Sequence, residues 1–384
     1  MPVRVEVTPE LLIWARERST RDPEELAARF PKLSEWEQGT LAPTLKQLES
    51  FARATRTPLG YLLLQEPPEE PLPIADYRTM GGEAIRRPSP DLLDTIFLCQ
   101  QRQDWYAEFA RAIGQAAVPF VGSLTTETPV VDAARTLAAA LEYGPEARGA
   151  SWANALRVLI DRAEDLGVLV MVNGVVGNNT RRKLRPTEFR GFSLVDELAP
   201  VVFVNGADTK AAQIFTLAHE LAHLWIGVSA LSDADPTSTP DMAVERWCNQ
   251  VAAEFLVPLA SLRAEFRRDR PLTAELERLA ARFRVSTLVV LRRVFDADFL
   301  TWDEYREVYA AERDRLLAIL EEDGEGGGGG NFYSAQPLRA SRRFSRAVIA
   351  SALEGTTLYR DAFQMLGVRS VSTFNELATQ LRGD

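Results

Sequence analysis

The residues most able to do chemistry in this sequence are its two histidines. His219 and His223 stand four residues apart in the string TLAHELAHLW, with Glu220 directly after the first. On an α-helix of 3.6 residues per turn this spacing places both imidazoles on one face, so both can reach one ion. Glu220 is rotated by about 100° from His219, where its carboxylate can act on a water beside that ion. The HExxH pattern therefore predicts a metal site.

The third ligand has to come from another element. A catalytic zinc ion usually takes three protein ligands and a water, and with no histidine left the third is Asp, Glu or Cys. The helix predicted at 242–257 offers Glu245, Cys248, Asn249 and Glu254. Glu245 and Asn249 lie one turn apart, so we interpret Glu245 as the third ligand and Asn249 as an acceptor for a ligand histidine N–H. Glu254, on the opposite side, remains the alternative ligand, and Cys248 is more typical of a small core residue.

This ligand set predicts gluzincin-like, metal-assisted hydrolysis of a peptide bond, with Zn²⁺ as the ion and Mn²⁺ or Fe²⁺ as alternatives. Glu220 would remove the proton from the attacking water and pass it to the leaving amine. A strand predicted at 200–205 precedes the metal helix, and as an edge strand it could pair with an extended peptide. No histidine is left for the oxyanion, so a Tyr, an Arg or a backbone N–H must stabilise it.

The elements that position the motif follow from the hydrophobic pattern. The motif helix, predicted at 209–226, has apolar residues on several sides and is expected to be buried. Short β-branched segments predict strands at 167–172, 190–195 and 200–205. Helical periodicity extends over 90–165, 242–257, 274–296 and 302–321. The segment 227–241 joins the two ligand helices and is predicted to be a surface connection, with a lid as the alternative.

Length and composition limit the remaining choices. A chain of 384 residues is too long for one ordinary core and indicates two or three domains. Its net charge of −10 excludes a generally basic nucleic-acid binder. Two distant cysteines, Cys99 and Cys248, favour a reducing, cytoplasmic location. Neither a signal peptide nor an apolar run of ~18 residues is present, so no membrane association is expected.

The strings IFTLAHELAHLW and ERWCNQVAAEFLVP resemble the ImmA/IrrE family of metallopeptidases over about 155–300. The positions that match are Pro200, Asn205, Phe215, Thr216, Ala218, His219, Glu220, His223, Glu245, Asn249, Ala252, Leu256 and Pro258. Val251 stands where the family usually has Phe. The resemblance implies a zincin-like domain in which His219, His223 and Glu245 bind the metal and Glu220 is the catalytic base. It also implies cleavage of helix-turn-helix repressors or antirepressors in mobile elements or stress responses.

The N-terminal stretch, read as helices broken by turns, is similar to the helix-turn-helix module of phage-repressor-like (XRE-type) proteins. The likeness rests on Leu26, Ala27, Trp36, Glu37, Gly39, Pro43, Thr44, Leu48 and Ala52. The stretch between Ala27 and Trp36 is about one helical turn shorter than in that module, where the recognition helix would lie. Residues 1–66 also carry 9 basic and 10 acidic residues, a poor balance for neutralising phosphates. A protein-binding or structural role is therefore the stronger interpretation, with DNA binding as the alternative.

Two basic clusters lie elsewhere. Arg181, Arg182, Lys183 and Arg185 are placed in a turn between strands. Arg339, Arg342, Arg343 and Arg346 follow helical spacing and predict a stripe on one helix face. Such a stripe is most simply a solvated face, and the alternative is a contact with an acidic partner or nucleic acid.

Together these patterns predict an α+β, mostly helical chain. We expect five parts: a helix-turn-helix-like module (1–66), a linker and helical region (67–154), a zincin-like metallopeptidase domain (155–322), a glycine hinge (323–330) and a helical C-terminal module (331–384). The predicted function is a zinc endopeptidase that cleaves a regulatory protein of the repressor or antitoxin class. The alternative is a non-catalytic antitoxin or transcriptional regulator that binds DNA or a toxin partner, and either could form an oligomer.

Overall fold

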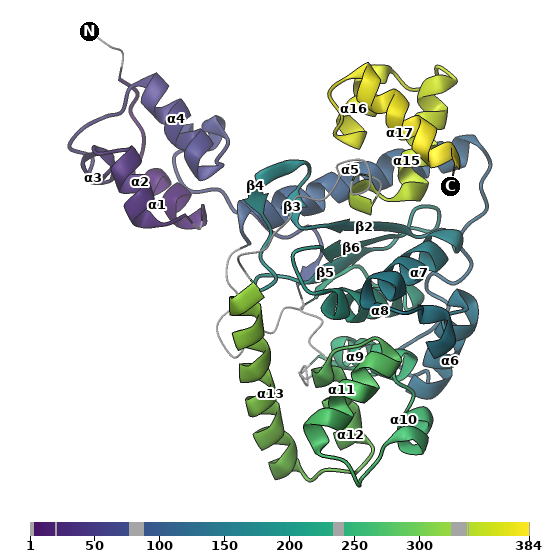
Figure 1. Cartoon of the computed structure of the whole chain (residues 1–384). Coiled ribbons are helices and arrows are strands. Elements are labelled where there is room, and N and C mark those ends of the chain that lie inside the picture. The colour runs from purple at the N-terminus through teal and green to yellow at the C-terminus, as the bar shows by residue number, and fades with distance from the viewer. Residues whose placement is uncertain are drawn as a thin grey trace. The chain divides into compact units, whose positions relative to one another are not determined.

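A computed structural model of the chain describes residues 4–19, 21–76, 88–232, 242–323, 336 and 338–383. The chain forms two compact units. The N-terminal unit contains Met1–Pro73 and Gly81–Phe97, and the main unit contains Ile74–Met80 and Leu98–Asp384. Helices predominate, and the sheets are small, as expected for an α+β chain (Figure 1).

Short helices build the N-terminal unit, as predicted: α1 (Pro9–Arg18), α2 (Pro23–Arg29), α3 (Leu33–Glu37), α4 (Leu45–Thr55) and the 3₁₀ helix η1 (Leu59–Leu63). They enclose a core that includes Leu11, Trp36 and Phe51, in which the last two rings meet edge to face at 6.4 Å. A capping box between Thr44 and Gln47 begins α4. The stretch where a recognition helix would lie holds α3, which has 5 residues.

A five-stranded mixed sheet lies in the main unit, in the order β1-β7-β5-β6-β2. Its strands are β1 (Ala75–Asp76), β2 (Leu169–Asn173), β5 (Gly191–Leu194), β6 (Val201–Asn205) and β7 (Ala230–Ser232). β2 is parallel to β6, β5 is antiparallel to β6 and β7, and β1 is parallel to β7. A separate hairpin pairs β3 (Val175–Val176) with β4 (Asn179–Lys183).

The three predicted strands are confirmed as β2, β5 and β6, but the expected edge position of β6 is wrong. β6 pairs with β5 on one side and β2 on the other, so its backbone has no free edge for a peptide. Sequence reasoning also missed β7, within the predicted connection 227–241, and β1, within the predicted linker. These two strands are three and two residues long, too short for a periodic signal.

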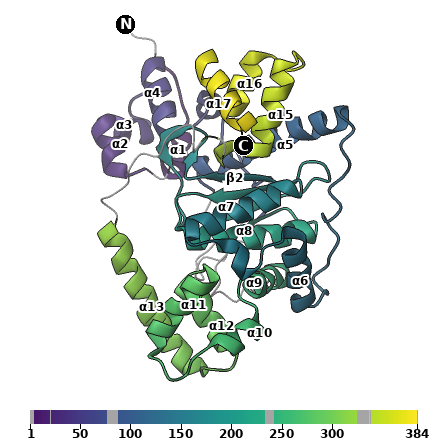
Figure 2. The ribbon, with the colours of Figure 1, turned by 45° about the vertical axis from the view of Figure 1, so that its right-hand side comes forward.

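Helices cover both faces of the sheet (Figures 1 and 2). α7 (Trp152–Asp165) and α8 (Lys210–Trp225) lie on one face, and the part of α5 (Pro90–Ala112) that belongs to the main unit lies on the other. Alternate side chains of β2 face these two helical layers. Val170 packs into the core formed with α7 and α8, whereas its neighbour Met171 contacts Cys99 of α5, with 3.6 Å between the two sulfurs.

Seven further helical segments of the main unit lie between residues 130 and 323: α6 (Val130–Leu141), η2 (Pro145–Arg148), α9 (Ala243–Leu256), α10 (Leu259–Glu265), α11 (Leu272–Phe283), α12 (Thr287–Asp296) and α13 (Trp302–Asp323). Two expectations of continuous helix are wrong. Residues 113–129 are not helical, and the predicted helix 274–296 is interrupted at Arg284, whose φ is +54°. A left-handed residue at that point ends α11 and lets α12 turn back on it.

The C-terminal helices α15 (Arg342–Leu353), α16 (Tyr359–Leu366) and α17 (Val371–Gly383) belong to the same compact unit as the sheet. Buried Arg102 of α5 donates hydrogen bonds to the backbone carbonyls of Met365 and Arg339. Glu164 of α7 accepts hydrogen bonds from Ser341 and from the Arg342 backbone N–H. The predicted glycine hinge lies outside the described residues from Gly324 onward.

Among the described residues, no helix is both long enough and apolar enough to cross a membrane.

Candidate metal centre

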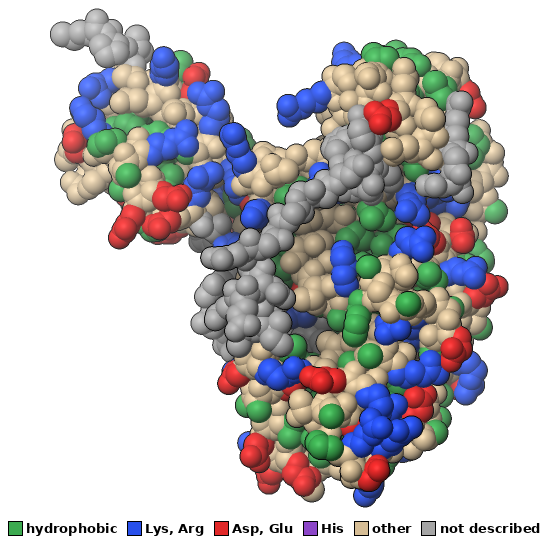
Figure 3. Space-filling model, in the orientation of Figure 1, with side chains coloured by type: hydrophobic (Ala, Val, Ile, Leu, Met, Phe, Trp, Pro, Cys, Tyr) green, Lys and Arg blue, Asp and Glu red, His purple; other side chains and the backbone are tan. Residues whose placement is uncertain are grey.

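The HExxH motif lies in α8, at the centre of the main unit. Thr209 caps the N-terminus of α8 by accepting a hydrogen bond from the Ala212 N–H, and every side chain from Gln213 to Trp225 is buried. His219, Glu220 and His223 are each 0% exposed. The predicted burial of this helix is confirmed, and neither histidine is visible on the face shown in Figure 3.

His219, His223 and Glu245 come together, as the sequence led us to expect. The two Nε2 atoms are 3.1 Å apart. Glu245 of α9 places Oε2 3.2 Å from His219 Nε2 and Oε1 2.9 Å from His223 Nε2. Three potential ligand side chains from two helices therefore converge on one point in the buried interior.

This geometry fits a tetrahedral metal ion. Ligand atoms about 2.0–2.1 Å from zinc in a tetrahedron lie about 3.3 Å from one another, close to the three distances observed. Two neutral imidazoles whose Nε2 atoms face each other would need one of them to donate, while a bound cation satisfies both nitrogens and the carboxylate. The donor set of two imidazoles and one carboxylate suits Zn²⁺, and also Mn²⁺ or Fe²⁺.

The charges within this cluster are strongly coupled. Burial acts to lower the pKa of His219, but Glu245, Glu220 and Asn249 together outweigh it and the pKa is raised. Burial and the charge of His219 lower the pKa of His223. Burial acts to raise the pKa of Glu245, yet the two histidines bring it down to about 2. Glu245 is therefore held as an anion that needs positive charge beside it.

Glu220 lies beside this cluster, close enough for the charges of His219 and Glu245 to act on its pKa. Both of its carboxylate oxygens are buried and make no hydrogen bond of normal geometry. Burial raises the pKa of Glu220 to about 8, aided by the charge of Glu245 and opposed by His219 and by the hydroxyls of Ser232 and Ser193. A perturbed carboxyl group next to three potential ligands is the arrangement expected of a general base.

The other residues considered on α9 have separate roles. Glu254 forms a buried ion pair with Arg293 and accepts a hydrogen bond from the Leu259 N–H, so it is engaged away from the histidines. Cys248 is fully buried in the hydrophobic core. Asn249 lies close enough to His219 to act on its pKa, which it raises.

Sequence reasoning missed two serines and one glycine at the site. Ser232 Oγ is 3.4 Å from both His223 Nε2 and Glu245 Oε1. Gly191, which pairs with Ser232 across β5 and β7, lies against α8, where a Cβ atom would be 2.5 Å from Thr216 Cγ2. The available signal was the alternation in RGFSLV, which puts the small residues Gly191 and Ser193 on one face of a strand.

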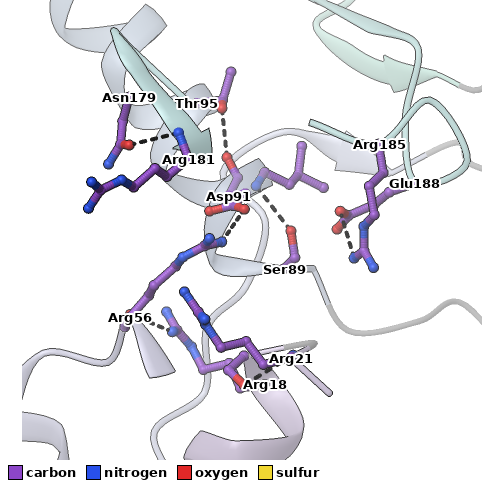
Figure 4. Close-up of polar contacts among 12 residues, drawn as sticks. Arg18, Arg21, Arg56, Ser89, Asp91, Thr95, Asn179, Arg181, Arg185 and Glu188 are labelled. Carbon is purple, nitrogen blue, oxygen red and sulfur yellow. Dashed lines mark hydrogen bonds and ion pairs between the residues drawn. The ribbon is translucent and has the colours of Figure 1, made fainter. Parts of the chain in front are cut away.

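The first basic cluster is not a turn. Arg181, Arg182 and Lys183 lie in β4, because the hairpin turn comes earlier, at Gly177–Asn178. Figure 4 shows the Arg181 backbone N–H donating to Asn179 and the Arg185 side chain paired with Glu188 at 3.4 Å.

The C-terminal arginines are largely engaged within the chain. Arg342 pairs with Asp161 at 2.8 Å, and Arg343 donates to the Tyr106 hydroxyl at 2.8 Å. Arg339 donates to Asn178, and Arg346, the exposed one of the four, donates to the Leu381 carbonyl. Three of the four therefore hold the C-terminal helices against the rest of the main unit.

Comparisons with known proteins give two family matches. Residues 340–380, within the C-terminal helices, match a domain of unknown function (DUF8813). No curated protein and no solved structure shows a significant match. Residues 163–295, which include α8 and α9 with all three potential ligands, match the family model described as the IrrE N-terminal-like domain of peptidases. This match supports an ImmA/IrrE-type peptidase domain in this part of the chain.

Proposed function

We propose that this chain is a cytoplasmic metallo-endopeptidase, most simply zinc-dependent, that cleaves a regulatory protein of the repressor or antitoxin class. The observation that supports it most directly is the buried triangle of His219, His223 and Glu245 with Glu220 beside it. The family match over 163–295 supports a peptidase, and the free, buried Cys99 and Cys248 agree with a reducing compartment.

In this proposal His219, His223 and Glu245 hold the ion, which when bound supplies Lewis acidity toward a peptide carbonyl and a water molecule. Glu220 removes a proton from the attacking water and delivers it to the amine of the leaving peptide. Its pKa of about 8 is high for a base at neutral pH, and positive charge beside it lowers that pKa, as His219 already does. Asn249 orients His219 from α9.

Glu220→Gln tests the catalytic assignment. The variant should bind zinc with the stoichiometry of the wild type but lose cleavage, because an amide cannot accept the proton. Glu127→Gln, which changes an exposed carboxylate, is the matched control and should retain cleavage. The inactive variant should also retain its protein substrate, which co-purification and mass spectrometry would identify. A Glu220→Gln variant with full biological effect would contradict the proposal.

The alternative, a non-catalytic regulator that binds DNA or a toxin partner, is favoured by one feature of the N-terminal unit. A surface cavity of about 420 Å³ is lined by the exposed cations Arg29, Lys32 and Lys46 beside the N-terminus of α4. Binding of the chain to its own promoter DNA, with an affinity that falls steeply as salt rises, would support this function. Loss of that affinity in Lys32→Gln/Lys46→Gln, with unchanged zinc content, would assign it to this cavity.

A further inference from the structure

The last residue of β7 reaches the metal centre. Ser232 contacts His223 and Glu245 through its hydroxyl, and it pairs across the sheet with Gly191, which lies against α8 near Glu220. β7 therefore runs directly to the ligands and the candidate base. A polypeptide paired along the outer side of β7 would be delivered to the same place.

That outer side is occupied by a segment of this chain. Ala75 pairs with Ala230 and Asp76 with Leu231, in parallel, so Asp76 lies one register position before Ser232. The segment follows Pro71 and Pro73, which have no backbone N–H and cannot extend the ladder as donors. Within the described residues the pairing covers two residues, in the stretch Ile74–Met80 that belongs to the main unit and interrupts the N-terminal unit in sequence.

β1 is also more exposed to solvent than β7, the strand with which it pairs. Ala230, Leu231 and Ser232 are each 0% exposed, whereas Ala75 is exposed and Asp76 is half-buried. β1 joins β7 through the backbone ladder. Recognition of this kind demands little of the side chains, and any extended segment with free N–H groups can make it.

We propose that the outer edge of β7 is where the metal centre binds an extended peptide, and that Ala75–Asp76 occupies this edge as an internal competitor. This inference rests on the proposed peptidase function and replaces β6, which has no free edge, with β7 as the substrate-binding strand. The partner is an extended or unfolded polypeptide segment that pairs by its backbone. A protein substrate must displace β1 before its scissile bond reaches Glu220.

Such a competitor is effective although its pairing is short. A tethered segment is present at an effective concentration on the order of millimolar, so free peptides that bind β7 equally well but are less concentrated cannot displace it. A substrate that pairs over more residues, or that also binds elsewhere on the chain, gains enough to replace it. The internal strand therefore limits cleavage to substrates held by a second contact.

The test disrupts the pairing of β1 with β7 and measures hydrogen exchange at the backbone amides of β7. Ala75→Pro/Asp76→Pro deletes both N–H donors of β1, and Glu66→Pro/Glu69→Pro adds two prolines to exposed linker positions as the matched control. Ile74→Gly/Ala75→Gly/Asp76→Gly weakens the strand without proline. We expect those amides of Ala230–Ser232 that face β1 to exchange hydrogen at least ~10-fold faster in both β1 variants and at the wild-type rate in the control, while the amides that face β5 stay protected. A synthetic peptide of residues 71–76, added at ~millimolar concentration, should restore protection.

Cleavage of an unfolded probe, fluorescently labelled casein, gives the second readout. In both β1 variants kcat/KM should rise several-fold, mainly through a lower KM. Unchanged exchange at Ala230–Ser232 would overturn the inference, and so would faster exchange combined with slower cleavage, because β1 would then complete the site. A third outcome separates the two proposals: no form of the protein cleaves casein, but hydrogen exchange is faster in the β1 variants and the peptide slows it again. That result supports occupancy of the β7 edge by β1 and contradicts only the proposed peptidase function.

Discussion

A Cβ atom on Gly191 would lie 3.2 Å from Cγ of Glu220. The same atom would be 2.5 Å from Thr216 Cγ2 and 2.9 Å from the Phe203 carbonyl oxygen. β5 can approach the motif helix this closely only because residue 191 has no side chain. The close approach brings the β5–β7 edge next to the candidate base.

Gly191→Ala should therefore reduce both stability and activity. The added methyl group forces β5 away from α8, and overpacking of this kind decreases the free energy of unfolding by about 1–3 kcal/mol. Gly144→Ala is the control, since nothing lies within 4 Å of its Cβ position and its φ of −82° suits alanine. Denaturant unfolding of both variants provides the measurement, and equal midpoints would contradict the close packing.

Substitutions of the two acidic residues of α9 should have different effects, one on metal binding and the other on stability. Glu245→Gln should weaken zinc binding by more than about 100-fold, because loss of residues that merely orient ligands already weakens binding 10- to 100-fold. Glu254→Gln should leave zinc stoichiometry unchanged but lower the free energy of unfolding by about 2 kcal/mol, because Arg293 loses one of its two carboxylate partners and keeps Asp296. Zinc titration and denaturant unfolding measure the two effects, and the reverse pattern would make Glu254 the ligand.

Removal of the metal should lower the melting temperature of the main unit. An ion held by α8 and α9 binds only the folded chain, so zinc at 100 times its Kd raises Tm by about 5–10 °C. Calorimetry with and without a chelator measures this shift. His219→Ala/His223→Ala is the control, in which the chelator should have no effect. A wild-type Tm that is insensitive to complete metal removal would argue against a metal site linking the two helices.

Glu164 should make stability depend on pH. Burial raises its pKa from 4.5 to about 7, against the hydrogen bond from Ser341. The folded chain thus binds more protons than the unfolded chain between these values, and the free energy of unfolding falls as pH rises from about 4.5 to 7. In Glu164→Gln this contribution of about 3 kcal/mol disappears, while the amide oxygen can still accept from Ser341.

Denaturant unfolding across this pH range compares the wild type with that variant. Glu142→Gln, which removes a carboxylate that is 70% exposed, should retain the wild-type slope. If Glu164→Gln also retains it, the pH dependence arises elsewhere.

How much of this structure could be predicted depends on the range of the interactions. The burial of α8 and the meeting of His219, His223 and Glu245 follow from helical spacing and from the small number of candidate ligands, both of which are local. The position of β6 inside the sheet depends on β2 and β5, which no local pattern reports. β7 and β1 exist only through pairing with each other and with β5, which lie far apart in the sequence, so local patterns place Ser232 in a surface connection.

The break at Arg284 illustrates a different limit. Arginine is a good helix former, and helical periodicity continues on both sides of it. Its left-handed conformation is stabilised by contacts of its side chain with the Gly149 and Ala281 carbonyls. The sequence gives no glycine or proline at this point to signal the end of the helix.

Arg102 holds the C-terminal helices by the backbone carbonyls of Arg339 and Met365. Every amino acid provides such a carbonyl, so this attachment places no demand on which residues stand at those two positions. A substitution at Met365 would therefore leave this contact intact, whereas Arg339 also contacts Asn178 through its side chain. This contact requires one arginine in α5 and a backbone path that brings the two carbonyls within hydrogen-bond distance of it.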